Sequence, residues 1–321
     1  MPGAGRPAGD HGRRPGACVT PSPAASHPPP PHPVVAAVDG SPASGAAAHA
    51  AARTARQLSA PLELVRVLAL PSEDPVDERG SGVALHTAAG ELDVLRRELV
   101  AVAPDLAVTA VVRRGRAGDE LVEASRTAER IVLGEHAAGR GLGSVIDLLV
   151  RRAHCPVLLH RRGRRPAGGV VVGLDCLPGT DALLDAAADE AVARGAVLHV
   201  VHGRTSRRPG SGVLDAERAL LEGLVSRAQL PRPGLVVHLQ VRHEGAGSLL
   251  LDAADGAQLL VLGRRPSPAE RRSSGTGTTL LLRAPCSLLL VAVERAAPPA
   301  DRPDDPDGVG PPALPAAAGR A

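Results

Sequence analysis

The chain has 321 residues, enough for two domains, and its 44% hydrophobic content can supply each domain with a core. It contains no Phe, Tyr or Trp, and all 37 of its basic residues are arginines. The absence of lysine excludes a Walker A loop and a pyridoxal Schiff base, and the absence of aromatic residues excludes a base-stacking platform for single-stranded nucleic acid. The net charge is only +3, with 34 acidic residues, which is too mixed for a nucleic-acid footprint.

Residues 1–33 are rich in Pro, Gly and Ala, and we expect them to form a disordered N-terminal arm. From residue 34 to residue 160, apolar runs of strand length alternate with segments of helical period. The predicted strands are 34–38, 62–69, 106–113, 130–134 and 156–160, and the predicted helices are 43–58, 84–102, 117–128 and 144–153.

A basic linker at 161–168 is followed by a second series of the same kind, at 169–294. Its predicted strands are 170–174, 196–202, 235–242, 258–262 and 287–293, and its predicted helices are 180–194, 213–228, 246–255 and 277–283. Residues 295–321 are again rich in Pro and Ala, and we expect a disordered C-terminal tail.

The two series repeat one another. The run VVAAVDGS at 34–41 returns as VVVGLDCL at 170–177, and RIVLG at 130–134 returns as LLVLG at 259–263. Strand and helix alternation requires right-handed crossovers and a parallel sheet covered on both faces. The sequence therefore predicts two tandem, doubly wound α/β domains of Rossmann-like type, each a five-stranded parallel sheet in the order 3-2-1-4-5 with helices on both faces.

In such a sheet, ligands bind outside the carboxyl ends of the strands, where the strand order reverses. Asp39 ends the first strand of copy one and Gly134 ends its fourth, as Asp175 and Gly263 do in copy two. A carboxylate there can accept hydrogen bonds from an adenine amino group or ribose hydroxyls, and glycine lets a ligand approach the backbone. The repeated residues therefore predict one ligand cleft per domain.

Two further features bear on that cleft. Gly143 and Ser144 open the last helix of copy one, where free backbone amides and the helix dipole favour phosphate. On the other hand, Asp39 followed by Gly40 and Ser41 is also an ordinary strand-to-helix turn and cap. Both interpretations of the turn stay open at this stage.

Several motifs, taken in order, resemble the universal stress protein family in its tandem two-domain form. They are V-D-G-S at 38–41, the Gly134 end of strand four, and L-G-S-V at 142–145 leading to H-C-P-V at 154–157. Copy two resembles the family through V-G-L-D at 172–175 and A-P-C at 284–286. The resemblance covers about residues 34–160 and 169–294.

This resemblance implies binding of ATP or a related adenine nucleotide, with Mg²⁺ as a further candidate. Asp39 and Val67 would face the adenine and ribose, Gly134 the ribose, and Gly143 with Ser144 the phosphates, while Gly40 and Ser41 complete the turn. The matching positions of copy two are Asp175, Val200, Gly263, Gly275 and Thr276. The family would act in the stress response through ligand-dependent interactions with a protein partner that the sequence does not identify.

Both copies depart from the family's phosphate loop, G-x2-G-x9-G-[ST]. In copy one the loop from Gly134 to Gly143 is four residues too short, and in copy two Pro266 replaces a glycine and removes a backbone N–H donor. The alternative function is therefore a nucleotide-independent interaction scaffold of the same fold.

No G-x-S-x-G elbow, H-E-x-x-H helix or Cys-x-x-Cys pair occurs, so we expect no enzyme, although slow ATP hydrolysis stays open. The cysteines, at 18, 155, 176 and 286, have neither zinc-ligand spacing nor the density of a disulfide scaffold, which favours a cytoplasmic location. Neither a nucleic-acid partner nor a membrane is expected. The last strands, 156–160 and 287–293, should pair the two copies within the chain, with a homodimer as a further possibility.

Overall fold

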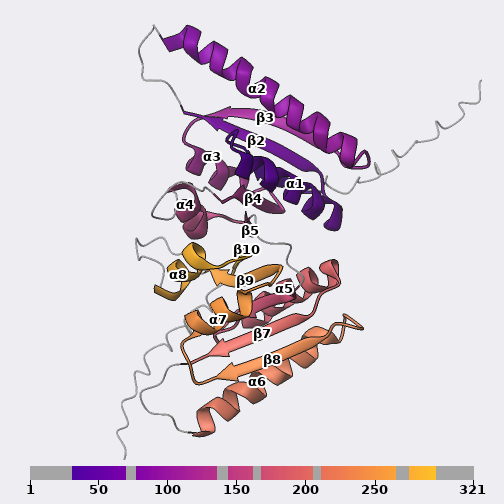
Figure 1. Cartoon of the computed structure of the whole chain (residues 1–321), viewed down its shortest axis with the longest axis vertical. Coiled ribbons are helices and arrows are strands. Elements are labelled where there is room, and N and C mark those ends of the chain that lie inside the picture. The colour runs from indigo at the N-terminus through magenta and orange to yellow at the C-terminus, as the bar shows by residue number, and fades with distance from the viewer. Residues whose placement is uncertain are drawn as a thin grey trace, which may run out of the picture. The chain divides into compact units, whose positions relative to one another are not determined.

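The structure is a computed structural model that describes residues 31–69, 77–135, 144–161, 168–204, 211–264 and 275–293. Along these residues strands and helices alternate as the sequence predicts (Figure 1). The expected N-terminal arm and C-terminal tail, and most of the expected linker, lie outside the described residues.

Domain 1 runs from β1 to β5 and is a parallel sheet in the order β3-β2-β1-β4-β5. This is the predicted 3-2-1-4-5 order. Its elements are β1 (Val34–Ala37), α1 (Pro42–Gln57), β2 (Leu62–Leu68), α2 (Asp77–Val102), β3 (Val108–Arg114), α3 (Ala117–Ala124), β4 (Arg130–Gly134), α4 (Ser144–Arg152) and β5 (Val157–His160).

Domain 2 runs from β6 to β10 and repeats the same parallel order, β8-β7-β6-β9-β10. Its elements are β6 (Val170–Gly173), α5 (Thr180–Arg194), β7 (Leu198–Gly203), α6 (Ser211–Gln229), β8 (Val237–Arg242), α7 (Ala246–Ala254), β9 (Leu259–Arg264), α8 (Gly275–Arg283) and β10 (Ser287–Ala292).

Two predicted helices of domain 1 have different bounds in the structure. The helix predicted at 84–102 begins at Asp77, because Gly80 and Gly82 in its first turns hide the helical period from sequence reasoning. The helix predicted at 117–128 ends at Ala124. There the Ser125 hydroxyl donates to the Val122 carbonyl at 2.5 Å, which closes the last turn.

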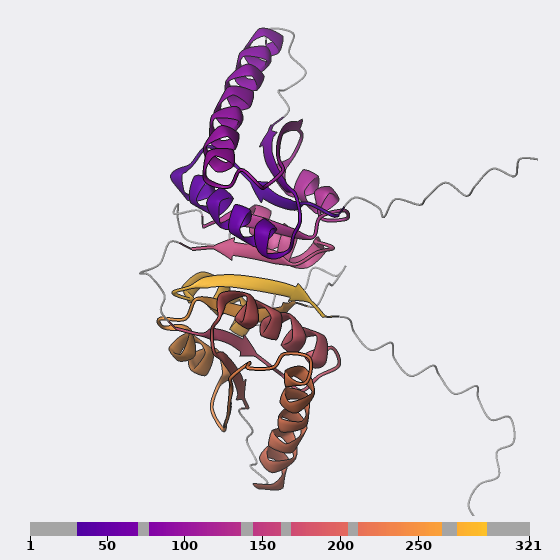
Figure 2. The ribbon, with the colours of Figure 1, turned by 90° about the vertical axis from the view of Figure 1, so that its right-hand side faces the viewer.

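The last strands of the two domains pair with each other, which confirms the predicted intrachain pairing. β5 and β10 run antiparallel, with Val157 opposite Leu290 and Leu159 opposite Leu288. Figure 2 shows the yellow arrow of β10 beside the pink arrow of β5. The pairing satisfies two sheet edges at once and joins both domains into one ten-stranded sheet.

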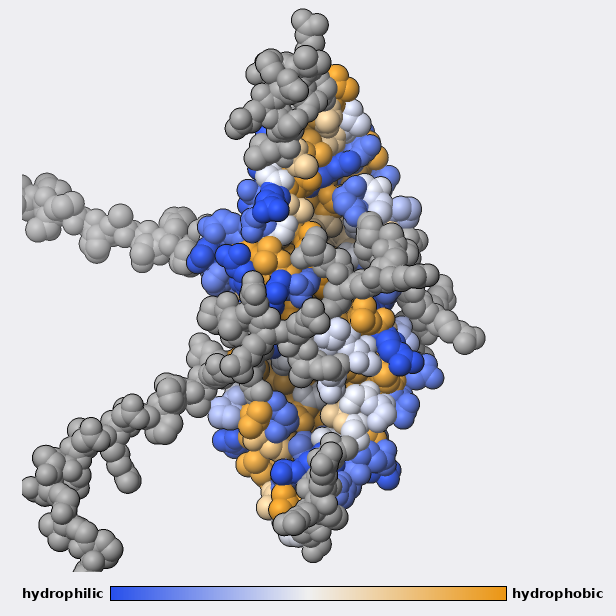
Figure 3. All heavy atoms as spheres, turned by 90° about the vertical axis from the view of Figure 1, so that its left-hand side faces the viewer, coloured by the Kyte–Doolittle hydropathy of each residue, from blue (hydrophilic) through white to orange (hydrophobic). Residues whose placement is uncertain are grey.

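The core lies on both faces of this sheet, because side chains alternate along each buried strand. Val34 and Ala36 pack with α1 and α2 on one face, whereas Val35 packs with Leu121 and Leu149 of α3 and α4 on the other. On the face of the molecule that Figure 3 shows, hydrophobic and hydrophilic residues are interspersed over both domains. None of the described helices is long and apolar enough to cross a membrane.

Buried arginines also hold the domains together. Arg130 of β4 pairs with Glu190 of α5 at 2.6 Å, with side chains 10% and 7% exposed, and Glu190 also pairs with Arg194. Arg161, just after β5, donates from its guanidinium to the carbonyl oxygens of Leu281 and Ala284 at the end of α8. A cation at the C-terminal end of a helix satisfies free carbonyls and favours the helix dipole.

Candidate functional site

In domain 1 a cavity of about 310 Å³ lies at the carboxyl ends of β1, β2 and β4. Asp39, Val67 and Gly134, which are far apart in the sequence, all line it. Ser41 lines it as well, and most of the remaining wall is apolar. We call this cavity the domain-1 cleft. Its size and its mixture of apolar walls with a few polar groups are typical of small-molecule sites.

The turn that carries Asp39 is held by its own side chains. The Ser41 N–H donates to Asp39 Oδ1 at 2.9 Å, and the Ser44 N–H donates to Ser41 Oγ at 3.1 Å as the N-cap bond of α1. Gly40 lies between them with a φ of +86°, a backbone conformation that favours glycine. The capping interpretation of Asp39 and Ser41 is therefore observed, and the Asp39 carboxylate lines the cleft at the same time.

Close packing against α1 requires a glycine at Gly134, a role that the sequence alone did not indicate. A Cβ at this position would lie 2.6 Å from the carbonyl carbon and oxygen of Ala43 and 2.8 Å from the Ser44 nitrogen. The first turn of α1 thus packs directly on β4. At the matching Gly263, a Cβ would meet only the side chains of Leu183, at 3.1 Å, and Val293, at 3.3 Å.

In domain 2 a cavity of about 400 Å³ occupies the corresponding position, and we call it the domain-2 cleft. Asp175, Gly263 and Thr276 line it, as predicted, together with Val201. The prediction of Val200 is wrong, because Val200 is fully buried in the core on the opposite face of the sheet. Strand register explains the error.

In that register, β1 residue Ala37 lies opposite Val65, and β6 residue Gly173 lies opposite Val201. Val65 and Val201 are therefore equivalent, and two residues further along each strand the counterpart of Val67 is Gly203. A Cβ on Gly203 would lie 2.9 Å from the Ala246 Cα and from the Glu244 carbonyl oxygen. Backbone from the β8–α7 connection therefore fills the space that the Val67 side chain occupies in domain 1.

The predicted phosphate-loop residues are placed only in part. Gly143 lies outside the described residues, and Ser144 begins α4. Gly275 begins α8, and Thr276 follows it at the rim of the domain-2 cleft. Within the described parts of the chain no group of three or more His, Cys, Asp or Glu side chains is arranged to hold a metal, so we assign no residues to Mg²⁺.

The turn of domain 2 is more strained than its counterpart. Cys176 occupies the position of Gly40 and has a φ of +56°, which is costly for a residue with a side chain. Asp175 Oδ1 accepts the Leu177 N–H at 3.2 Å, but the N-cap residue of α5 is Gly179, which makes no side-chain cap bond. Domain 2 lacks both the glycine and the serine cap that stabilise the corresponding turn of domain 1.

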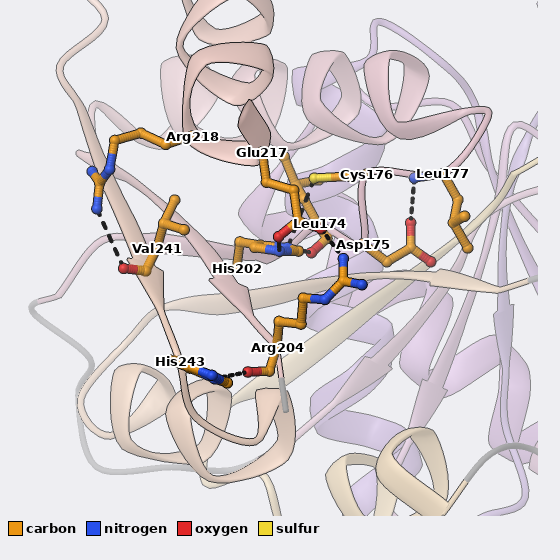
Figure 4. A network of polar contacts seen from close by, with 10 residues as sticks. All are labelled: Leu174, Asp175, Cys176, Leu177, His202, Arg204, Glu217, Arg218, Val241 and His243. Carbon is orange, nitrogen blue, oxygen red and sulfur yellow. Dashed lines mark hydrogen bonds and ion pairs between the residues drawn. The ribbon is translucent and has the colours of Figure 1, made fainter. Parts of the chain in front are cut away.

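Beneath the domain-2 turn lies a polar network that the sequence did not reveal (Figure 4). The buried His202 donates from Nδ1 to the Leu174 carbonyl oxygen at 2.8 Å, and its Nε2 lies 3.3 Å from Glu217. Cys176 Sγ lies 3.9 Å from the same Nδ1. Glu217 also pairs with Arg204.

This network has the residue types of a thiol–imidazole–carboxylate site but not its chemistry. His202 Nδ1 is already bonded to a carbonyl oxygen and so cannot accept the thiol proton. Burial, together with the charges of Glu217 and Asp175, raises the pKa of Cys176. An activated nucleophile needs a lowered thiol pKa. The network therefore supports the turn.

The cysteines of the strand-five turns are buried thiols. Burial raises the pKa of Cys155 to about 11 and that of Cys286 to about 11. Each precedes the last strand of its domain and packs in the core. Both stay protonated at neutral pH, where a thiol is a small apolar group.

Comparison with known proteins agrees with this geometry. The model of the family described as "Universal stress protein family" matches residues 31–161 and 168–292. The chain is 31% identical over 269 residues to Universal stress protein Rv2624c of Mycobacterium tuberculosis, covering 80% of this chain and 95% of that protein. It is 30% identical over 274 residues to Universal stress protein Rv1996 of the same species, covering 72% and 84%.

Among solved structures, a universal stress protein from Archaeoglobus fulgidus DSM 4304 superposes with a TM-score of 0.67 at 16% identity. The match covers 81% of this chain and 97% of that one. At this identity the likeness concerns the fold, which the two proteins share over most of both chains.

Proposed function

The chain belongs to the universal stress protein family, and on this premise we propose that it binds an adenine nucleotide of the ATP class and acts in the stress response through ligand-dependent interactions. The observation that carries the proposal is the convergence of Asp39, Val67 and Gly134 on one cavity. The family resemblance implies that these three residues face the base or the ribose. They lie at the ends of three separate strands or just after them, and all three line the same 310 Å³ cavity. The proposed activity is binding of the nucleotide without its hydrolysis. The proposed location is the cytoplasm.

The chemistry of the domain-1 cleft suits the base and the sugar. Aliphatic side chains such as Val65, Val67 and Leu133 can cover the faces of an adenine ring in a chain that has no aromatic residues. The Asp39 carboxylate accepts the Ser41 N–H, and its two oxygens together offer about four lone-pair positions. It can accept from an amino group or ribose hydroxyls while it holds the turn.

The test is calorimetry of the full chain with ATP, ADP, AMP and adenosine, on the wild type and on Asp39→Asn. An asparagine side-chain oxygen can still accept the Ser41 N–H, so this variant keeps the turn and loses the charge. We expect it to weaken binding about tenfold, because a charged acceptor contributes roughly twice as much as a neutral one. Asp105→Asn, on the exposed ion pair with Arg56 and outside the cleft lining, is the matched control.

The second candidate function is a nucleotide-independent scaffold. The observation in its favour is that Asp39 and Ser41 already have a capping role that needs no ligand. If the wild type binds none of the four ligands at millimolar concentration, the nucleotide proposal fails and the scaffold remains.

A further inference from the structure

Two histidines lie opposite each other on neighbouring strands of domain 2. The parallel register of β7 and β8, which are side by side in Figure 1, pairs His199 with His238. Each is the second residue of its strand, so the pair lies near the amino ends, away from the clefts at the carboxyl ends. Paired residues of a sheet point to the same face. The two rings meet edge to face, with their centroids 5.3 Å apart and an angle of 78° between their planes.

Both rings are accessible to a ligand. His238 is exposed and His199 is partly exposed. Among the residues that the structure describes, neither ring forms a hydrogen bond or an ion pair, and their polar contact is with each other. Burial and the neighbouring His238 lower the pKa of His199, so its ring is neutral at neutral pH. The neutral imidazole is the form that binds a metal ion.

The surroundings of the pair differ from those in domain 1. Gly169 has no side chain to cover the His199 ring, and a Cβ there would lie 2.7 Å from Cδ2 and 3.0 Å from Nε2. In domain 1 the matching positions of β2 and β3 hold Glu63 and Thr109, paired in the same register. Glu63 forms an ion pair with Arg113 at 3.3 Å. The histidine pair is therefore a feature of domain 2 and not a requirement of the repeated fold.

We propose that His199 of β7 and His238 of β8 together bind a divalent transition-metal ion of the zinc class. Two imidazoles on one tetrahedral Zn²⁺, with metal–nitrogen distances of about 2.0 Å, have their ring centres about 5 Å apart. The observed separation of 5.3 Å agrees with this geometry. Imidazole nitrogen suits Zn²⁺, Ni²⁺ and Cu²⁺, whereas Mg²⁺ prefers oxygen ligands.

Two protein ligands are fewer than a structural zinc site has, so water completes the coordination and the metal is exchangeable. Neither histidine lines a cleft, and the proposal does not rest on nucleotide binding. A bound ion would link β8, the last strand in the sheet order, to β7. The register of the strands brings the two rings together only in the folded sheet. The metal should therefore bind the folded chain more tightly than the unfolded chain and stabilise it.

The experiment is urea denaturation of the full chain with and without micromolar Zn²⁺, with Mg²⁺ at the same concentration as the metal control. We expect Zn²⁺ to raise the urea midpoint of the wild type and Mg²⁺ to leave it unchanged. His199→Gln and His238→Gln should each lose most of the rise, because removal of one ligand weakens chelation about 10- to 100-fold. The double variant should behave like either single variant, since one imidazole alone does not chelate.

His243→Gln is the matched control. His243 is an exposed histidine just after β8, and its ring already bonds the Arg204 carbonyl oxygen. This variant should keep the full rise with Zn²⁺. The chain has 12 histidines and four cysteines, and comparison between variants cancels metal binding by those that stay unchanged.

Three results would overturn the proposal: no rise in the wild-type midpoint with Zn²⁺, an undiminished rise in His238→Gln, or an equal loss of the rise in His243→Gln. If the partly buried His199→Gln does not fold, the exposed His238→Gln still decides the question. Calorimetry with adenosine on His238→Gln separates this site from the clefts. Unchanged adenosine binding with the Zn²⁺ effect lost supports a separate metal site, whatever the outcome for the proposed function.

Discussion

Both clefts lie at the carboxyl ends of the strands in the same sheet order, but different elements form the walls and turns around them. The domain-1 cleft lies within its own domain, beside a turn with glycine at its left-handed position and a serine cap. The domain-2 cleft has a strained Cys176 in its turn and takes part of its wall from α4 of the other domain. Duplication thus preserved the sheet order, while the ligand-facing surfaces diverged around it. Variants that act on one copy only can test this difference.

The largest effect is expected where the domains meet. Glu190→Ala leaves the Arg130 guanidinium buried without its charge partner, which should lower the free energy of unfolding by about 3–5 kcal/mol. Asp105→Ala, on the exposed pair with Arg56, should cost less than about 1 kcal/mol. Urea denaturation of both variants measures the difference. Similar small losses in the two would mean that the buried pair does not hold the domains together.

Alkaline pH should destabilise both copies in the same way. The folded-state pKa of Cys155 and of Cys286 is about 11, against an ordinary value of 9.0, so these thiols stabilise the fold fully below pH 9. That contribution is lost between pH 9 and 11, at about 1.4 kcal/mol per pH unit for each thiol. The chain has no Tyr and no Lys, so the other side chains that titrate in this range are the thiols of Cys18 and Cys176, which the double variant below keeps unchanged.

The measurement is urea denaturation at pH 8, 9 and 10. A double variant, Cys155→Ala with Cys286→Ala, should be less stable at pH 8 but should lose less stability on going to pH 10. Equal pH slopes for the wild type and the double variant would show that the thiols are not protonated in the fold at pH 10.

The strand-four glycines should respond differently to one methyl group. Gly134→Ala places a Cβ against the Ala43 carbonyl and should cost about 1–3 kcal/mol as an overpacked contact. Gly263→Ala meets only two side chains that can move, and it should change stability by less than about 1 kcal/mol. Thermal unfolding of the pair compares them directly. Equal losses would contradict the different packing of α1 and α5.

The smallest effect is expected in the strand-one turns. Cys176→Gly should raise stability by up to about 1 kcal/mol, because glycine adopts a φ of +56° without the cost that a side chain brings, although it loses more entropy on folding. Gly40→Ala should lower stability by a similar amount. Equilibrium unfolding of both gives the comparison. A stability loss in Cys176→Gly would mean that the contact with His202 outweighs the strain.

The sequence predicted the sheet order and the convergence of Asp39 and Gly134, because strand alternation and the switch point follow from pattern alone. It misplaced Val200, because equivalence between copies depends on strand register, which only paired strands define. It also missed the burial of Arg130 and Arg161. In a chain whose basic residues are all arginines, nothing in the sequence separates the buried ones from the solvated ones. The shared wall of the domain-2 cleft arises from packing between domains and has no local signature.

The most direct test of the account is a crystal structure of the full chain grown with millimolar ATP. We predict adenine and ribose in the domain-1 cleft, with the Asp39 carboxylate within hydrogen-bond distance of them. A structure with both clefts empty at that concentration would contradict the proposed nucleotide function.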